Sequence, residues 1–114
     1  PGFTAYTGED SLTIPSMSVG AKGVVSVTGH VAGKQMVEMM EAFAAGQVGK
    51  AAALHGKLLA LHKALFMQPN PVPVKTALRL CGFDVGSLRP PLKDASPETT
   101  EALKKALSGL GLIK

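Results

Sequence analysis

The sequence predicts an α/β fold in which two parallel strands precede a long helical region. Phe3–Tyr6 is rich in aromatic and β-branched residues, as short strands are. Gly23–Thr28 is a nearly continuous apolar run, which is typical of a strand covered on both faces. After Thr28 the apolar residues recur at helical spacing, so no further strand is expected.

A short helix is expected between the two strands. Glu9–Ser11 places acids and a hydroxyl where the N-terminus of a helix favours them. The helix then covers Leu12–Val19, and a start at Thr13 or Ile14 would bring Pro15 into the first turn, where proline is tolerated. A strand, a helix and a second strand within about 25 residues form a βαβ unit, which implies a parallel sheet.

Four further helices account for most of the remaining chain. They are predicted over Gly33–Ala45, Val48–Phe66 and Val72–Leu80, and from Ser96 onward. The last helix opens with a serine N-cap and with Pro97 at its first position. A proline-rich connector separates the second of these helices from the third, and a proline-bearing linker precedes the last.

Two strands alone would be poorly stabilised. A two-stranded unit leaves unpaired edges and is marginal in water. A segment as apolar as Val24–Val27 needs neighbours on both sides. We therefore expect these strands to pair with further strands outside this chain. A start at Pro1, without an initiator methionine, also suggests a piece of a longer protein.

The composition argues against several functional classes. Lysine and arginine give a net charge of +4, but they are scattered along the 114 residues, and only 4% of residues are aromatic. Neither a basic patch nor a stacking platform for nucleic acid is therefore expected. No apolar run approaches the ~20 residues of a membrane span. The single cysteine, Cys81, fits a reducing compartment, so a cytoplasmic location is predicted.

The histidines do not predict a metal site. His55 and His62 share one helix face but stand seven residues apart, or about 10 Å along the axis. One ion cannot bridge that gap with bonds of ~2 Å, so both are interpreted as packing residues. Cys81 is interpreted as a small buried apolar residue. No metal or cofactor is predicted.

Three stretches carry a family resemblance: Thr7–Leu12, Gly23–Thr28 and Gln68–Lys75. In this order they resemble the C-terminal portion of the dihydrodipicolinate synthase family. The resemblance runs from about Phe3 to the end of the chain. It implies a TIM (β/α)8 barrel, with residues 1–46 as its last two strand–helix units and residues 47–114 as a C-terminal helical region.

The resemblance also implies a chemistry. Members of the family are lyases of lysine and diaminopimelate biosynthesis, and they condense pyruvate with L-aspartate 4-semialdehyde through a lysine Schiff base, without a cofactor. The Schiff-base lysine of the family lies upstream of this segment. Lys22 precedes the second strand and Lys75 lies beyond the barrel, so neither suits the role. No catalytic residue is predicted here, and the chain alone is expected to be inactive.

Two backbone positions are implied to contact substrate. Gly8 would lie at the rim of the pyruvate pocket. The carbonyl of Val25 would face the Schiff-base nitrogen, while the Val25 side chain belongs to the core. The neighbouring acids Glu9 and Asp10 are interpreted as partners of a helix N-terminus.

Asn70 is a weaker candidate that would support the site from behind. It stands between Pro69 and Pro71 in a rigid corner, and the alternative interpretation is a turn amide that caps nearby backbone. His30 departs from the family pattern, inherits no role and is interpreted as a loop residue.

The resemblance implies partners as well. The chain would need the missing N-terminal part of the barrel, and the whole protein would form a homotetramer of tight dimers with Pro15–Val19 at the weaker contact. Two alternatives remain open from the residues. One is a sister aldolase, such as N-acetylneuraminate lyase or a keto-deoxy-sugar-acid aldolase, and the other is a non-enzymatic helical interaction module.

Overall fold

The chain forms two compact units, Pro1–Leu59 and Ala60–Lys114, each of which is described by itself. The structure is a computed structural model that describes residues 2–114, so Pro1, where the predicted barrel region begins, lies outside the described residues. The predicted boundary between residues 46 and 47 stays a prediction.

Two extended segments of the first unit lie side by side and run parallel. Thr7 and Val24 form a parallel bridge, in which the Thr7 N–H donates to the Gly23 carbonyl at 3.0 Å and the Val25 N–H to the Thr7 carbonyl at 2.8 Å. A third bond runs from the Lys22 N–H to the Ala5 carbonyl at 2.9 Å. The predicted adjacency and direction are therefore observed.

Neither segment is a regular strand within residues 2–114, so the predicted strands Phe3–Tyr6 and Gly23–Thr28 are wrong in that respect. Successive peptide groups of an extended chain point to opposite edges. Thr7 therefore faces the second segment, while the peptide groups of Tyr6 and Val24 face the outer edges, where the described chain offers them no backbone partner. One bridged edge is too little to form a ladder.

A short helical stretch follows the first segment. It consists of a 3₁₀ turn, η1 (Asp10–Leu12), and the helix α1 (Thr13–Ser18), with Val19 as the C-cap. The expected start at Thr13 is confirmed, and Pro15 lies in the first turn, where its missing N–H breaks no helical bond.

The helix α2 (Gly29–Ala44) begins four residues before its predicted start. The interpretation of His30 as a loop residue is therefore wrong, because His30 lies in the first turn of α2. The start is set by contacts around the turn before it, since the Gly29 N–H donates to the Ser26 hydroxyl at 2.7 Å. Ala32, at φ −126° and ψ 36°, interrupts the helical conformation directly before Gly33, where the helix was predicted to start.

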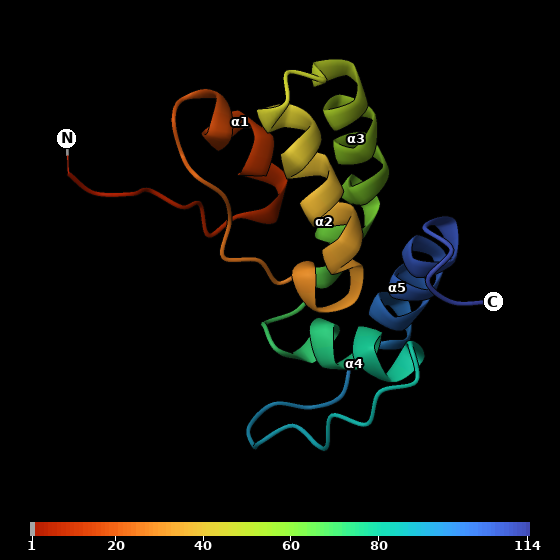
Figure 1. Cartoon of the computed structure of the whole chain (residues 1–114). Coiled ribbons are helices and arrows are strands. Elements are labelled where there is room, and N and C mark those ends of the chain that lie inside the picture. The colour runs from red at the N-terminus through yellow and green to blue at the C-terminus, as the bar shows by residue number, and fades with distance from the viewer. Residues whose placement is uncertain (1) are drawn as a thin grey trace. The chain divides into compact units, whose positions relative to one another are not determined.

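A tight turn joins α2 to α3 (Val48–Leu65), close to the predicted Val48–Phe66. Gly46 takes a φ of +75° at the end of α2, a conformation that L side chains rarely adopt. Lys50 near the start of α3 pairs with Glu38 of α2 at 2.9 Å, and both side chains are about half exposed. Figure 1 shows α1, α2 and α3, and the first unit includes α3 as far as Leu59.

The second unit is built on α4 (Val72–Leu80) and α5 (Pro97–Gly109), which pack against each other. The predicted bounds of α4 and the predicted opening of α5 are confirmed. Buried side chains lie along one stripe of each helix: Val72, Pro73, Val74 and Ala77 on α4, and Thr99, Leu103, Ala106 and Leu107 on α5. The Ser96 hydroxyl caps α5 by accepting the Thr99 N–H at 3.1 Å.

An irregular segment connects α4 to α5 (Figure 1). Two cations of α4 hold it: Lys75 donates to the Ser87 carbonyl at 2.7 Å, and Arg79 donates to the Gly86 carbonyl at 2.5 Å. Arg79 also pairs with the exposed Asp94 at 3.2 Å. Among the described residues, no helix combines the length and the apolar character that crossing a membrane requires.

Candidate functional site

The carboxyl ends of the two extended segments bring Gly8 and Val25 together. Gly8 directly follows Thr7, whose carbonyl accepts the Val25 N–H, so the two backbones are neighbours across the bridge. The chain bends at Gly8, and the pairing of the two segments ends there. The Val25 carbonyl and the Gly8 peptide groups therefore make no hydrogen bond with the described part of the chain. The geometry leaves these backbone groups available to a ligand.

The Val25 side chain is not part of a core in this chain. It is 74% exposed, so the described residues do not form the predicted core around it, and a core completed by strands outside this chain stays a prediction. Phe3, on the first segment, is 87% exposed. Within the described residues no element covers the faces from which these two side chains project, which explains the difference.

The two acids after Gly8 have different roles. The Glu9 carboxylate is exposed and caps its own turn, since it accepts the Ser11 N–H at 3.3 Å and the Ser11 hydroxyl at 2.8 Å. This contact confirms the predicted pairing with a local helix start. Asp10 is instead completely buried, at 0% exposure.

Asp10 reaches across to the turn that follows Val25. Its carboxylate accepts the Val27 N–H at 3.0 Å, the Thr28 N–H at 3.1 Å and the Ser26 hydroxyl. These donors stand just before α2, so the negative charge also complements the N-terminus of that helix. The predicted partner of Asp10 was the helix that directly follows it, whereas its carboxylate contacts the start of a helix distant in sequence.

The contact between Asp10 and Ser26 was not predicted from the sequence. A signal for it exists, because Ser26 is the one hydroxyl inside the apolar run Val24–Val27. Buried polar groups are nearly always hydrogen-bonded, so such a serine calls for a partner. The sequence alone does not identify that partner as Asp10.

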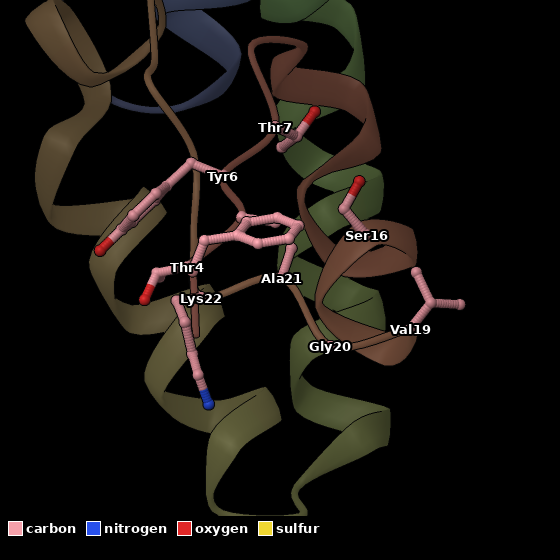
Figure 2. Close-up of a pocket in the computed structure, with 10 residues that line it drawn as sticks. Thr4, Tyr6, Thr7, Ser16, Val19, Gly20, Ala21 and Lys22 are labelled. Carbon is pink, nitrogen blue, oxygen red and sulfur yellow. The ribbon is translucent and has the colours of Figure 1, made fainter. Parts of the chain in front are cut away.

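An open hollow of about 500 Å³ lies beside the first segment but does not contain the site. Figure 2 shows Thr4, Tyr6 and Lys22 on one side of it and Ser16 and Val19 on the other. Neither Gly8 nor Val25 lines this hollow, and no carboxylate or imidazole does. Its titratable side chains are Tyr6 and Lys22, and the hollow lies apart from the Gly8 and Val25 backbone groups.

The structure places the two lysines considered for a Schiff base in different units. Lys22 is exposed and lies before the bridge, at the opposite end of the segment from Val25. Lys75 is committed to the Ser87 carbonyl in the second unit. Neither placement favours an imine at Val25.

His55 and His62 are buried or half-buried, whereas Cys81, predicted to be buried, is only partly buried. His62 is 2% exposed and His55 is half-buried, as predicted for packing histidines. Cys81 is the C-cap of α4, and its partial burial raises the pKa of the thiol. Residues 2–114 contain no group of three histidine, cysteine or acidic side chains able to hold a metal ion.

Asn70 lies in the second unit, immediately before α4. Its peptide bond to Pro71 is cis, its side chain is exposed, and within the described residues it makes no side-chain hydrogen bond. The alternative of a capping turn amide is therefore not observed. The neighbouring Gln68 links the connector to α5, since its side-chain oxygen accepts the Ser96 N–H at 2.8 Å.

Comparisons with known proteins cover almost the whole chain. The model of the dihydrodipicolinate synthetase family matches residues 1–110. The 4-hydroxy-tetrahydrodipicolinate synthase of Nostoc sp. is 50% identical over 111 residues, which are 97% of this chain and 38% of the relative. That of Thermosynechococcus vestitus is 49% identical over all 114 residues, again 38% of the relative.

Solved structures agree. Dihydrodipicolinate synthase from Thermotoga maritima superposes with a TM-score of 0.94 at 43% identity, over 97% of this chain and 38% of that one. A variant described as the first monomeric dihydrodipicolinate synthase also gives 0.94 at 43% identity, over 97% and 37%. The chain thus spans about 38% of the length of the curated relatives it matches, and it belongs to the dihydrodipicolinate synthetase family.

Proposed function

We propose that this chain supplies the C-terminal part of a 4-hydroxy-tetrahydrodipicolinate synthase. Such an enzyme is a lyase that condenses pyruvate with L-aspartate 4-semialdehyde for lysine and diaminopimelate biosynthesis. The observation that carries this proposal is that the Val25 carbonyl and the Gly8 peptide groups make no backbone hydrogen bond within the described residues, although they lie at the carboxyl ends of adjacent parallel segments. Relatives about 50% identical carry the name of this synthase, which does not favour a sister aldolase or a non-enzymatic helical module.

We infer that the two extended segments are the last two strands of a (β/α)8 barrel, followed by a C-terminal helical region. Their parallel pairing and the helix between them support this interpretation. The exposed Val25 and Phe3 side chains also support it, because a complete barrel would cover faces that lie open here.

In this reaction the chain would contribute contacts to the substrate and the imine rather than the reacting lysine. A lysine amine adds to the ketone of pyruvate and expels water, and the resulting imine loses a methyl proton to give an enamine that attacks the aldehyde. The Val25 carbonyl would accept from the N–H of the protonated imine, and the Gly8 backbone would border pyruvate. Asn70 would support this site from the connector before α4. The lysine itself would come from the N-terminal part.

The remaining proposals concern assembly and location. We propose that the whole enzyme is a homo-oligomer, most simply a tetramer in which Pro15–Val19 contributes to one contact. The exposed Val19 side chain supports a contact there, while the monomeric variant among the relatives indicates that assembly differs within the family. A cytoplasmic location is proposed from the single cysteine. No nucleic acid, membrane, metal or cofactor is required by this function.

A hybrid enzyme tests the proposal. The N-terminal part of the Nostoc sp. synthase is joined to this chain in place of its own C-terminal part, with the intact Nostoc enzyme as the control. We expect the hybrid to consume both substrates, and to trap pyruvate on its Nostoc part upon borohydride reduction. The 114-residue chain alone is expected to trap none.

Two results would contradict the proposal. One is a folded hybrid that neither condenses the substrates nor forms the reduced adduct. The other is a stoichiometric adduct on the chain alone at Lys22 or Lys75, which would overturn the assignment of the lysine to the N-terminal part.

A further inference from the structure

One buried carboxylate joins the two loops that carry the proposed substrate contacts. Asp10 follows Gly8 by two residues, and it binds the three residues that follow Val25. The contacts span 16 to 18 positions in sequence. No other carboxylate in residues 2–114 is buried.

The burial of Asp10 has a physical requirement. An ionised carboxylate that leaves water is strongly destabilised unless charge-assisted hydrogen bonds replace its hydration. Here two backbone N–H groups and one hydroxyl supply them, and the N-terminus of α2 adds its favourable dipole. Such a constellation holds one geometry firmly, because any displacement leaves the charge uncompensated.

The contacts also bear on the orientation of the Val25 carbonyl. That carbonyl belongs to the planar peptide unit between Val25 and Ser26. On one side the Val25 N–H is bonded to the Thr7 carbonyl, and on the other the Ser26 hydroxyl and the Val27 N–H are bonded to Asp10. The Ser26 oxygen is held a second time by the Gly29 N–H. The peptide plane is thus fixed from both ends.

We propose that Asp10 is a positioning residue for the synthase reaction, which orients the Val25 carbonyl toward the imine nitrogen and holds Gly8 beside it. This inference rests on the proposed function. Asp10 touches no reacting atom and acts through the Val25–Ser26 peptide. Glu9, although adjacent, cannot do the same, because it is exposed and, within residues 2–114, the hydrogen bonds of its carboxylate go to Ser11.

Amide exchange in the 114-residue chain tests the contact itself. Asp10→Asn keeps the side-chain shape but replaces one acceptor oxygen by an NH₂ group that cannot accept the N–H bonds. We expect exchange of the Val27 and Thr28 amides to accelerate about tenfold, the effect of losing roughly one hydrogen bond. The matched control Asp94→Asn removes an exposed carboxylate and should leave both rates unchanged. Unchanged rates in Asp10→Asn would overturn the inference.

Kinetics in the hybrid enzyme test the positioning. We expect Asp10→Asn to slow formation of the pyruvate adduct about 100-fold per folded molecule, as a small misplacement of a reacting group does. Ser26→Ala removes one of the three hydrogen bonds to Asp10 and should slow adduct formation about tenfold. It replaces Asp10→Asn as the test variant if Asp10→Asn does not fold. Folded protein is counted by circular dichroism and sedimentation, so a merely structural role would lower the amount of enzyme but not this rate.

The outcomes separate the two proposals. An active hybrid whose adduct rate is unchanged in both variants would overturn the positioning role and leave the proposed function intact. A folded parent hybrid without activity would overturn both, even where amide exchange confirms the contact. If adduct formation is slower in the Asp10 and Ser26 variants and unchanged in Asp94→Asn, both the positioning role and the proposed function are supported.

Discussion

The paired extended segments and the α4–α5 pair contain similar apolar residues but bury them to very different extents. Val25 and Phe3 on the segments are 74% and 87% exposed, whereas Leu103 and Leu107 on α5 are completely buried. A helix satisfies its backbone bonds within a few residues, so α4 and α5 form and pack from nearby sequence. An extended segment needs neighbours on both edges, which can lie far away in sequence. A helical region therefore tolerates separation from the rest of a fold better than a parallel sheet does.

Association of the chain should show the largest effect of this difference. Burial of apolar surface stabilises by about 25 cal/mol per Å², and the exposed segments leave that stabilisation unrealised. We expect the 114-residue chain to sediment as dimers or larger species, and Phe3→Ser combined with Val25→Ser to shift it toward monomer. A stable monomer with a cooperative unfolding transition would contradict the comparison.

Truncation of an apolar side chain to alanine should lower the free energy of unfolding much more in α5 than in the extended segments. Leu103→Ala should lower the free energy of unfolding by about 3 kcal/mol, because it removes a buried side chain and leaves a cavity. Val25→Ala removes a largely exposed side chain and should cost less than about 0.5 kcal/mol. Denaturant titration of each variant gives both values. Equal losses would mean that Val25 is covered in solution.

The same contrast explains which parts of the fold were predictable from sequence. The bounds of α4 and the start of α5 depend on local signals, namely a proline near each start and a serine cap on α5. Gly82 closes α4 locally as well, with a φ of +89° and with the Phe83 N–H bonded to the Leu78 carbonyl at 3.0 Å.

The predictions that differ from the structure concern positions determined by contacts between residues far apart in sequence. His30 lies in α2 because the hydrogen bonds of Asp10 and Ser26 fix the turn at which α2 begins. Asp10 is far from this turn in sequence, so no local pattern predicts the contact. Val25 was expected in a core completed by strands outside this chain, and its exposure within the described residues agrees with that need for further strands. At the site, the adjacency of Gly8 and Val25 followed from the predicted parallel pairing, while the Asp10 contact required the structure.

A smaller effect is expected at the cap of α5. Ser96→Ala should lower the free energy of unfolding by about 1 kcal/mol, because the Thr99 N–H loses its acceptor. Ser108→Ala is a matched control, since its exposed hydroxyl makes no side-chain hydrogen bond within the described residues. Thermal or denaturant unfolding measures both. A cost as large for Ser108→Ala would show that serine loss alone, rather than capping, is responsible.

The smallest effect concerns Cys81, at the end of α4. Partial burial raises the pKa of its thiol above the ordinary value of 9.0. A raised pKa means that the folded chain holds the proton more tightly than the unfolded chain does. The thiol therefore contributes stability that is fully present below pH 9 and is lost as the pH rises through the folded pKa. Unfolding measured from pH 7 to beyond pH 10, under reducing conditions, should show a steeper alkaline decline than in Cys81→Ser, whose hydroxyl does not titrate there. Parallel curves would indicate that Cys81 is as solvated in the folded chain as in the unfolded one, and the second unit would then be looser at this helix end than the burial along α4 indicates.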